Sequence, residues 1–215
     1  MFRLTVILTI LYSLTGCSNT DNKSAVTDNA ILSVKTDKDL SGKNEAKDKV
    51  KPTCIFDNPD TSLSDIKLRD AESATKVLNV KRLNGDTTYN FYSQNKSQLL
   101  SVTVHPGDYY RQVSIFQVKY ADNSKIKATP TTLDSFVTEK HIKLGITKSE
   151  VVSKLGNCYT TNDSTKNCIT INYRLESPQD SKTKLLERQN MPIYYASYKF
   201  KNNRLAEFEF GFEYP

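Results

Sequence analysis

The chain has 215 residues, of which 37% are hydrophobic, 10% aromatic and 25% charged, and its formal net charge is +6. This length is enough for one domain or for two small fused units. The basic residues are scattered among acidic ones without a basic stripe or a reader motif, so we expect no nucleic-acid partner. A composition rich in Tyr and Phe, without Trp, favours a sheet over a helical bundle.

Residues 1–16 are predicted to be a cleaved signal peptide. Arg3 supplies a positive charge, and the apolar run over 4–14 is too short to cross about 30 Å of hydrocarbon. The sequence Leu-Thr-Gly-Cys that ends at Cys17 resembles the lipobox of bacterial lipoproteins. This resemblance implies diacylglycerol on the Cys17 sulfur, cleavage before Cys17 and acylation of the new amino group, which together anchor a protein to a membrane. An ordinary secretory signal followed by a coincidental cysteine is the alternative.

Residues 17–52 are predicted to form the lipidated cysteine and a disordered tether. Ser, Thr, Asp, Asn and Lys dominate this segment, and it has too few apolar residues to offset the entropy of ordering. As a flexible coil of about 35 residues it would span roughly 30–35 Å. Such a reach would lift a domain clear of the membrane surface.

The chain beyond the tether is predicted to contain two units, 53–140 and 141–215. Both contain an Ile-Lys-Leu triplet, at 66–68 and 142–144, followed by a short helix. Asp70 and Thr147 suit helix N-caps, with Glu150 at the capping-box distance from Thr147. Asn79 and Gly156 suit the position just past a helix C-terminus.

Three strands are predicted after each helix. Their ranges are 87–92, 98–104 and 112–120 in the first unit, and 169–175, 192–200 and 205–214 in the second. The last two flank a turn over 201–204, and the final strand alternates Phe or Tyr with Glu or Gly, so one face is expected to be buried. The predicted fold class is therefore α+β, with two tandem units of about 76 residues that share one antiparallel sheet and carry their helices on one face.

Two segments carry a family resemblance. Residues 144–156 begin Leu-Gly-Ile-Thr-Lys-Ser-Glu-Val and end Leu-Gly, and residues 198–205 read Tyr-Lys-Phe-Lys-Asn-Asn-Arg-Leu. Both resemble the SmpA/BamE lipoprotein family and the similar repeats of beta-lactamase inhibitor protein. The lipid anchor is similar to the first branch, which has a single unit, and the tandem arrangement is similar to the second. Neither branch is matched throughout, so no specific partner is implied.

The remaining cysteines predict a disulfide between Cys158 and Cys168. They flank a short polar stretch in a chain expected to reach an oxidising compartment, where such a bridge contributes about 2–3 kcal/mol. A cysteine pair just after the helix is also similar to the inhibitor protein. Cys54 is either a buried free thiol or a competitor for the bridge. No CxxC occurs and neither His is close in sequence, so we expect no metal and no other cofactor.

A catalytic centre is not predicted, and we expect a protein that is not an enzyme. His105 stands in a His-Pro-Gly-Asp turn, and His141 is expected to be a half-buried packing residue. Glu207 and Glu209 share one strand face and form a conceivable carboxylate pair, but solvated charges are the favoured interpretation. No HExxH, GxSxG, GxGxxG or P-loop motif is present.

Tyrosine pairs are the candidate partner-binding residues. Tyr109 and Tyr110 follow a turn, and Tyr194 and Tyr195 begin a strand. Adjacent residues of a strand point to opposite faces, so one ring of each pair is a candidate for an exposed sheet face. Packing at the edge of the core, with the hydroxyl in water, is the alternative for each.

The functional hypothesis is a membrane-anchored envelope lipoprotein that binds another envelope protein or an incoming periplasmic protein through its sheet, as inhibitors and immunity proteins do. An outer-membrane assembly accessory of the SmpA/BamE kind is the alternative, and an envelope hydrolase is the third candidate. Ser18 after the anchored cysteine resembles the pattern of lipoproteins sent to the outer membrane, so we expect the protein to face the periplasm there.

Overall fold

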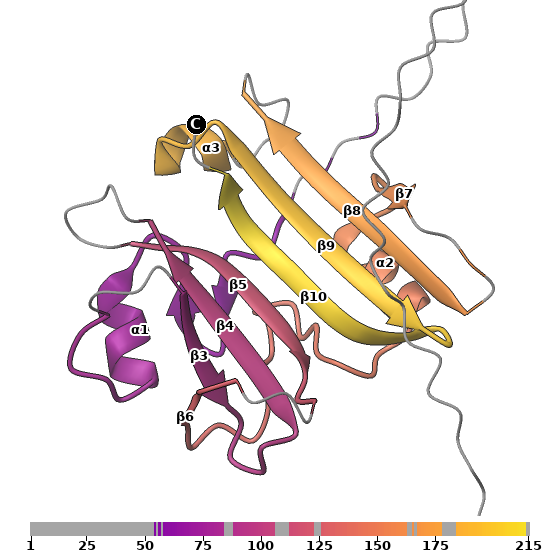
Figure 1. Cartoon of the computed structure of the whole chain (residues 1–215). Helices are drawn as coiled ribbons and strands as arrows, with labels where there is room; N and C mark the ends of the chain where they lie inside the picture. The colour runs from indigo at the N-terminus through magenta and orange to yellow at the C-terminus, as the bar shows by residue number, and fades with distance from the viewer. Residues whose placement is uncertain are drawn as a thin grey trace, which may run out of the picture. The chain divides into compact units, whose positions relative to one another are not determined.

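The computed structural model describes Cys54, Phe56 and residues 58–83, 88–105, 112–122, 126–162, 165, 167–177 and 184–213 (Figure 1). The signal peptide, Cys17 and the tether lie outside these residues. All described residues belong to one compact unit, Lys51–Pro215. The helices are α1 (Ala71–Val77), α2 (Lys148–Leu155) and α3 (Leu185–Gln189). The strands are β1 (Ser62–Leu63), β2 (Ile66–Lys67), β3 (Thr88–Tyr92), β4 (Gln98–Val104), β5 (Val113–Tyr120), β6 (Thr129–Pro130), β7 (Thr160–Asn162), β8 (Cys168–Glu176), β9 (Ile193–Lys201) and β10 (Arg204–Glu213).

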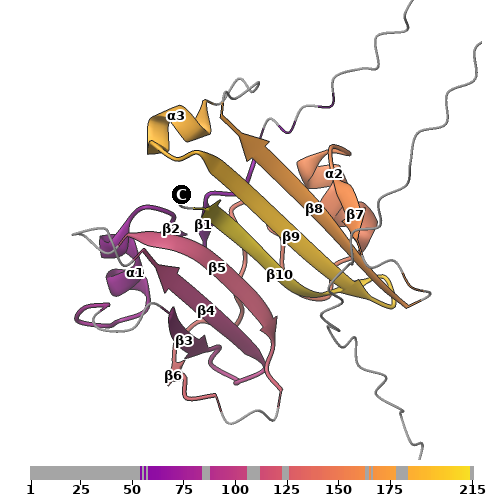
Figure 2. The ribbon, with the colours of Figure 1, turned by 45° about the horizontal axis from the view of Figure 1, so that its top comes forward.

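One large sheet dominates the described structure. Its strand order is β6-β3-β4-β5-β10-β9-β8-β7, and β1 and β2 form a small sheet of their own (Figures 1 and 2). All neighbours in the large sheet are antiparallel except β6 and β3, which are parallel. The central contact joins β5 to β10, so strands far apart in sequence complete the sheet.

The hairpin of β9 and β10 shows how alternation sets the register. Asn202 and Asn203 both have positive φ, as a two-residue type I′ turn requires. Across the hairpin Phe208 pairs with Tyr198 and Phe210 with Ala196, and all four side chains are buried. The alternating pattern places these side chains in the core, and the intervening residues on the opposite face.

The short helices depend on their caps. The Asp70 carboxylate accepts a hydrogen bond of 2.9 Å from Ser73 N at the start of α1. At the start of α2, Thr147 N donates to Glu150 Oε2 at 2.7 Å and Glu150 N donates to Thr147 Oγ1 at 3.3 Å. Gly156 ends α2 with φ of 86°. The predicted caps and stop are therefore confirmed, and they supply hydrogen bonds that helices of 7 and 8 residues otherwise lack.

The core lies on one face of the large sheet and is rich in aromatic side chains. Phe116 and Phe210 lie 5.3 Å apart across the junction of β5 and β10. Phe56, from the segment that precedes β1, packs on Tyr173 at 4.7 Å and on Tyr194 at 6.2 Å. A single cluster of buried residues therefore includes strands from both halves of the chain and the segment that leads into them.

The predicted fold class, two tandem units of a helix followed by strands, is wrong. The described chain is mostly β, and its large sheet is mixed because β6 pairs with β3 in parallel. The Ile-Lys-Leu triplets have different structures, since Ile66–Lys67 is strand β2 whereas residues 142–144 lie outside any helix or strand. The first half also adds β1, β2 and the parallel strand β6, and the second half adds α3 between β8 and β9. A triplet this short takes its conformation from its partners rather than from its own residues.

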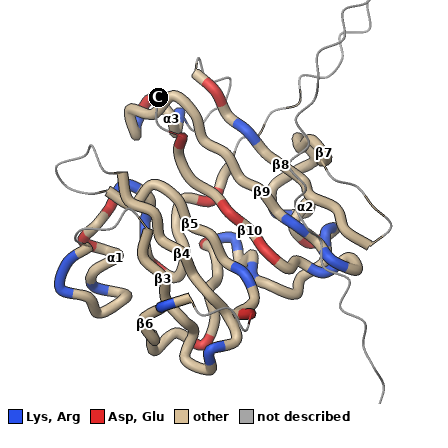
Figure 3. The backbone as a smooth tube through the Cα atoms, viewed as in Figure 1, with Lys and Arg blue, Asp and Glu red and all other residues tan. Residues whose placement is uncertain are grey.

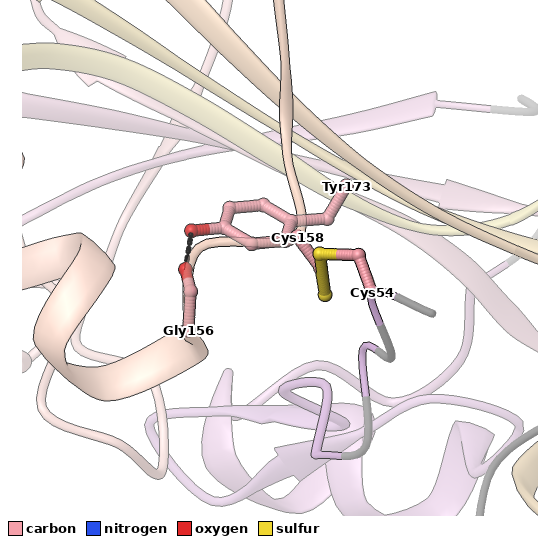
Figure 4. Close-up of a disulfide and its surroundings, with 4 residues drawn as sticks. All are labelled: Cys54, Gly156, Cys158 and Tyr173. Carbon is pink, nitrogen blue, oxygen red and sulfur yellow. Dashed lines mark hydrogen bonds between the residues drawn. A yellow bond between two sulfur atoms is a disulfide. The ribbon is translucent and has the colours of Figure 1, made fainter. Parts of the chain in front are cut away.

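The predicted disulfide between Cys158 and Cys168 is also wrong, because Cys158 is bonded to Cys54 (Figure 4). The Cα atoms of this pair are 5.3 Å apart, within the range a disulfide needs. Thr160 pairs with Asn172, so the direction of β7 carries Cys158 toward Arg174 and away from Cys168. At about 3.3 Å per residue, Cys158 and Cys168 are then separated by roughly 20 Å along β8.

Candidate functional site

The face of the large sheet opposite the core is the candidate site. In Figure 1 strands β8 and β9 pass in front of α2. Val151 and Leu155 of α2 belong to the core, so the strand side chains that alternate with core residues point away from α2. We call this surface the open face, and its described side chains are half-buried or exposed. It consists of Ile115, Gln117, Lys119, Glu207, Glu209, Glu213, Ile193, Tyr195, Ser197, Lys199, Thr170, Asn172, Arg174 and Glu176 on β5, β10, β9 and β8.

The same face is covered toward β3 and β4. Leu99 alternates with core residues of β4 and yet is only 1% exposed. Tyr92, its partner on β3, donates its hydroxyl to the carbonyl of Ile126 at 3.3 Å. The part of the face that remains open is therefore the part formed by β5, β10, β9 and β8.

An acidic column runs along β10 through the middle of the open face. Glu207, Glu209 and Glu213 form it, and Figure 3 shows the acidic positions along this strand. Lys119 of β5 and Lys199 of β9 pair with Glu207 from either side. The open face therefore has negative charge at its centre and basic groups beside it.

Hydrogen bonds between neighbouring strands hold these carboxylates in place. Gln117 Nε2 donates to Glu207 Oε1 at 2.9 Å. The Tyr195 hydroxyl donates to Glu209 Oε1 at 2.5 Å. Both contacts engage one oxygen of each carboxylate and leave side chains of the open face in fixed positions.

At the far end of the column Arg174 binds Glu213 through two parallel hydrogen bonds. Its Nη1 and Nη2 atoms donate to Glu213 Oε1 at 2.9 Å and Oε2 at 3.1 Å. Arg174 also donates to Glu176. This geometry orients the guanidinium across β8, β9 and β10, which is more restrictive than a single contact.

Tyr195 is the most prominent aromatic side chain of the open face. It lies on β9 directly opposite Gly211, and it is half-buried. Burial, together with the hydrogen bond to Glu209, raises the pKa of the Tyr195 phenol. The hydroxyl therefore stays protonated and donates throughout the neutral range.

The predicted tyrosine pairs fare differently. Tyr194 is 0% exposed, and its hydroxyl donates to the carbonyl of Asp60 at 2.7 Å. The prediction that Tyr194 contacts a partner is therefore wrong, because the pleat turns it into the core and leaves Tyr195 on the open face. Tyr109 and Tyr110 lie outside the described residues.

The histidines are not part of the open face. His105 follows β4, and its backbone N–H donates to the carbonyl of Gln112 at 3.1 Å. His141 has φ of 59° and is exposed in the turn from Thr138 to Ile142, so the prediction of a half-buried packing residue is wrong. Among the described residues no group of three His, Cys, Asp or Glu side chains gathers as a metal site would require.

A separate cavity of about 340 Å³ lies beside α3. The Glu139 carboxylate in its wall accepts hydrogen bonds from Thr61 N at 2.6 Å and from Thr61 Oγ1 at 3.0 Å. This carboxylate therefore fastens the chain before β1 to the loop before α2. The lining residues are Asn58, Pro59, Thr61, Glu139, Lys140, Leu185 and Arg188.

No family model, curated protein or solved structure matches the chain. Within the part of the chain that the structure describes, the helices are too short or too polar to cross a membrane. The assignment of a site therefore depends on the geometry of the open face.

Sequence reasoning missed most residues of this face. The acidic column has Gln117, Lys119 and Arg174 around it because β10 lies between β5 and β9. The spacing of residues in the sequence does not reveal that strand order. The alternation of β9, in which every second residue is buried, was the signal that could have separated Tyr195 from Tyr194.

Proposed function

We propose that this protein is an envelope lipoprotein, anchored through Cys17, that binds another protein through the open face of its sheet. The single observation that carries this proposal is the rigid array of half-buried side chains around Tyr195 and the acidic column. The partner class that fits is an envelope protein or a protein entering the periplasm, bound as inhibitors and immunity proteins bind their targets.

The composition of the open face supports a protein partner. Tyr and Arg side chains contribute much of the binding energy at protein interfaces, and Tyr195 and Arg174 both lie here. Hydrogen bonds to Glu209 and Glu213 already restrict these two side chains in the free protein. Binding therefore loses less side-chain entropy than it would with freely rotating groups.

The charge of the open face defines the partner further. Glu207 and Glu209 stand at its centre, and each uses one oxygen for a hydrogen bond within the sheet. We expect the partner to direct Lys or Arg side chains toward these carboxylates, with an apolar or aromatic group near Tyr195 and Ile193. Complementary charge of this kind selects partners and accelerates association.

The experiment is affinity purification of the anchored protein from its own cells, followed by mass spectrometry and by binding assays with the purified partner. Tyr195→Ala and Glu209→Gln are expected to weaken binding by at least about tenfold each, the range of residues central to an interface. Tyr120→Ala and Glu72→Gln are matched controls, since Tyr120 is 49% exposed and both lie outside the open face.

Equal binding by the open-face variants and by the controls would contradict the proposal. Copurification only with an integral barrel complex, independent of Tyr195, would favour an assembly accessory instead. Both results presuppose that each variant keeps the thermal stability of the parent protein, which circular dichroism measures.

A further inference from the structure

The end of the sheet at the β9–β10 hairpin gathers basic side chains from both faces. We call it the basic end, and it consists of Lys143, Lys148, Lys199, Lys201 and Arg204. Figure 3 shows the basic positions concentrated where β9 and β10 turn beside α2. All five side chains are exposed or half-buried.

Backbone contacts bring these residues together. Arg204 pairs with Lys201 across the hairpin and with Thr147 at the start of α2. Gly145 N donates to the carbonyl of Leu205 at 2.8 Å, which fixes the segment before α2 beside the hairpin. The basic end is therefore a structural feature and not a run of charge in the sequence.

The positive charge is only partly compensated. None of the five basic groups forms an ion pair with an acidic residue that the structure describes. Lys148 lies 5.0 Å from the centre of the Tyr159 ring, and Arg204 donates to the carbonyl of Gly145 at 3.1 Å. Glu150 lies among them, with its carboxylate accepting from Thr147 N, and Glu207 lies directly opposite Lys199 on β10.

We propose that the basic end rests on the anionic surface of the membrane that carries the protein. Lys199 and Lys201 alternate with core residues of β9 and so belong to the open-face side of the sheet, whereas Lys148 begins α2 and Lys143 lies in the segment that leads into it. Basic groups on both sides of the basic end fit a broad, flat anionic surface. A groove that binds one nucleic-acid strand or one peptide would instead gather its basic groups on one side. This contact involves the open face only at Lys199 and leaves the part around Tyr195 and Glu209 accessible to its partner.

The inference rests on the membrane anchoring of the proposed function, and its strength follows from electrostatics. Each Lys or Arg near an anionic bilayer increases binding about fivefold at physiological salt. This contact is too weak to hold the protein on the membrane alone. It adds to the binding by the lipid anchor, which keeps the basic end close to the membrane surface. It would fix which end of the domain faces the membrane.

Vesicle sedimentation tests the inference with the full chain carrying Cys17→Ser, so that no lipid contributes. Vesicles of 30% phosphatidylglycerol in phosphatidylcholine are compared with pure phosphatidylcholine at 50 and 500 mM salt. We expect binding only to the anionic vesicles, and weaker binding at high salt. The variant Lys143→Glu plus Lys201→Glu should weaken it at least about tenfold.

The matched control is Lys67→Glu plus Lys76→Glu, which reverses two exposed charges on β2 and α1 and should bind within about twofold of the parent. The inference is overturned if both double variants bind alike, or if the parent chain does not prefer anionic vesicles. Capture of the partner through Tyr195 is measured separately, so a failure of membrane contact and a failure of the proposed function are distinguishable.

Discussion

At the scale of single residues, Gly211 occupies the closest approach in the sheet. A Cβ atom there would lie 2.1 Å from the carbonyl oxygen of Ser114 and 2.7 Å from Ile115 Cα. Both neighbours are backbone atoms of β5, so they cannot rotate aside as a side chain would.

Gly211→Ala is expected to lower the free energy of unfolding by about 2–3 kcal/mol or more, because β5 and β10 must separate to admit the methyl group. Urea denaturation measures this change. Ser197→Ala, on the neighbouring strand of the same face, should stay within about 0.5 kcal/mol of the parent. An equal effect of both substitutions would contradict the close approach.

Asp60 is a buried carboxylate whose protonation affects stability. It is 0% exposed, Lys140 N donates to its Oδ1 at 3.1 Å, and its Oδ2 has no hydrogen-bond partner among the described residues. Burial raises its pKa from 3.8 to about 6, whereas contacts with Thr138 and Lys140 oppose the shift. Three other titratable groups interact electrostatically with Asp60, namely the Glu139 carboxylate and the phenols of Tyr194 and Tyr198.

The sign of the pH dependence follows from this raised pKa. Between pH 4 and 6 the folded protein retains a proton that the unfolded chain has lost, so stability falls as the pH rises through this window and stays level above it. Asp60→Asn should remove this slope. As the pH rises from 4 to 7, the free energy of unfolding of the variant should therefore increase by roughly 1–3 kcal/mol relative to that of the parent. Urea denaturation at several pH values tests this, and parallel profiles for both proteins would contradict it.

At the scale of elements, the bounds of the long strands agree closely with those predicted from the sequence. β4 has its predicted bounds, and the strands β3, β5, β8, β9 and β10 begin and end within one residue of theirs. Alternation decides these strands locally, since a half-buried strand shows a period of two. Helix α3 lies between two of these strands, β8 and β9, and buries Leu185 and Leu186.

The disulfide of Cys54 and Cys158 attaches the segment before β1 to the segment after α2. It joins two cysteines that are 104 positions apart in the sequence. The double variant Cys54→Ser plus Cys158→Ser is expected to lower the free energy of unfolding by about 2–4 kcal/mol, mainly because the unfolded chain gains conformational freedom. Thermal unfolding measures the loss. Peptide mapping without reduction should recover Cys54 joined to Cys158, and a peptide joining Cys158 to Cys168 would contradict the structure.

At the scale of the whole molecule, the junction of β5 with β10 makes the two halves depend on one another. Five residue pairs, from Glu207 with Lys119 to Gly211 with Ile115, join the strands, and Phe116 packs on Phe210 beneath them. Separating the halves would expose this packing and two strand edges.

Residues 53–140 and 141–215, produced as separate chains, are therefore expected not to unfold cooperatively, whereas the whole chain should show a single transition. Circular dichroism during urea denaturation measures both. A sharp transition in either fragment would show that the halves are independent domains and would contradict their dependence on the shared sheet.

The sequence by itself determined the features that depend on near neighbours. Alternation predicted the long strands, Asp70 and Thr147 predicted the caps, and the two asparagines predicted the tight turn, because each depends on residues within a few positions. The tertiary structure decided the order of the sheet, the partner of Cys158 and the charge of the open face. Each depends on which distant strands lie side by side, and the burial of apolar surface decides that for the whole chain at once.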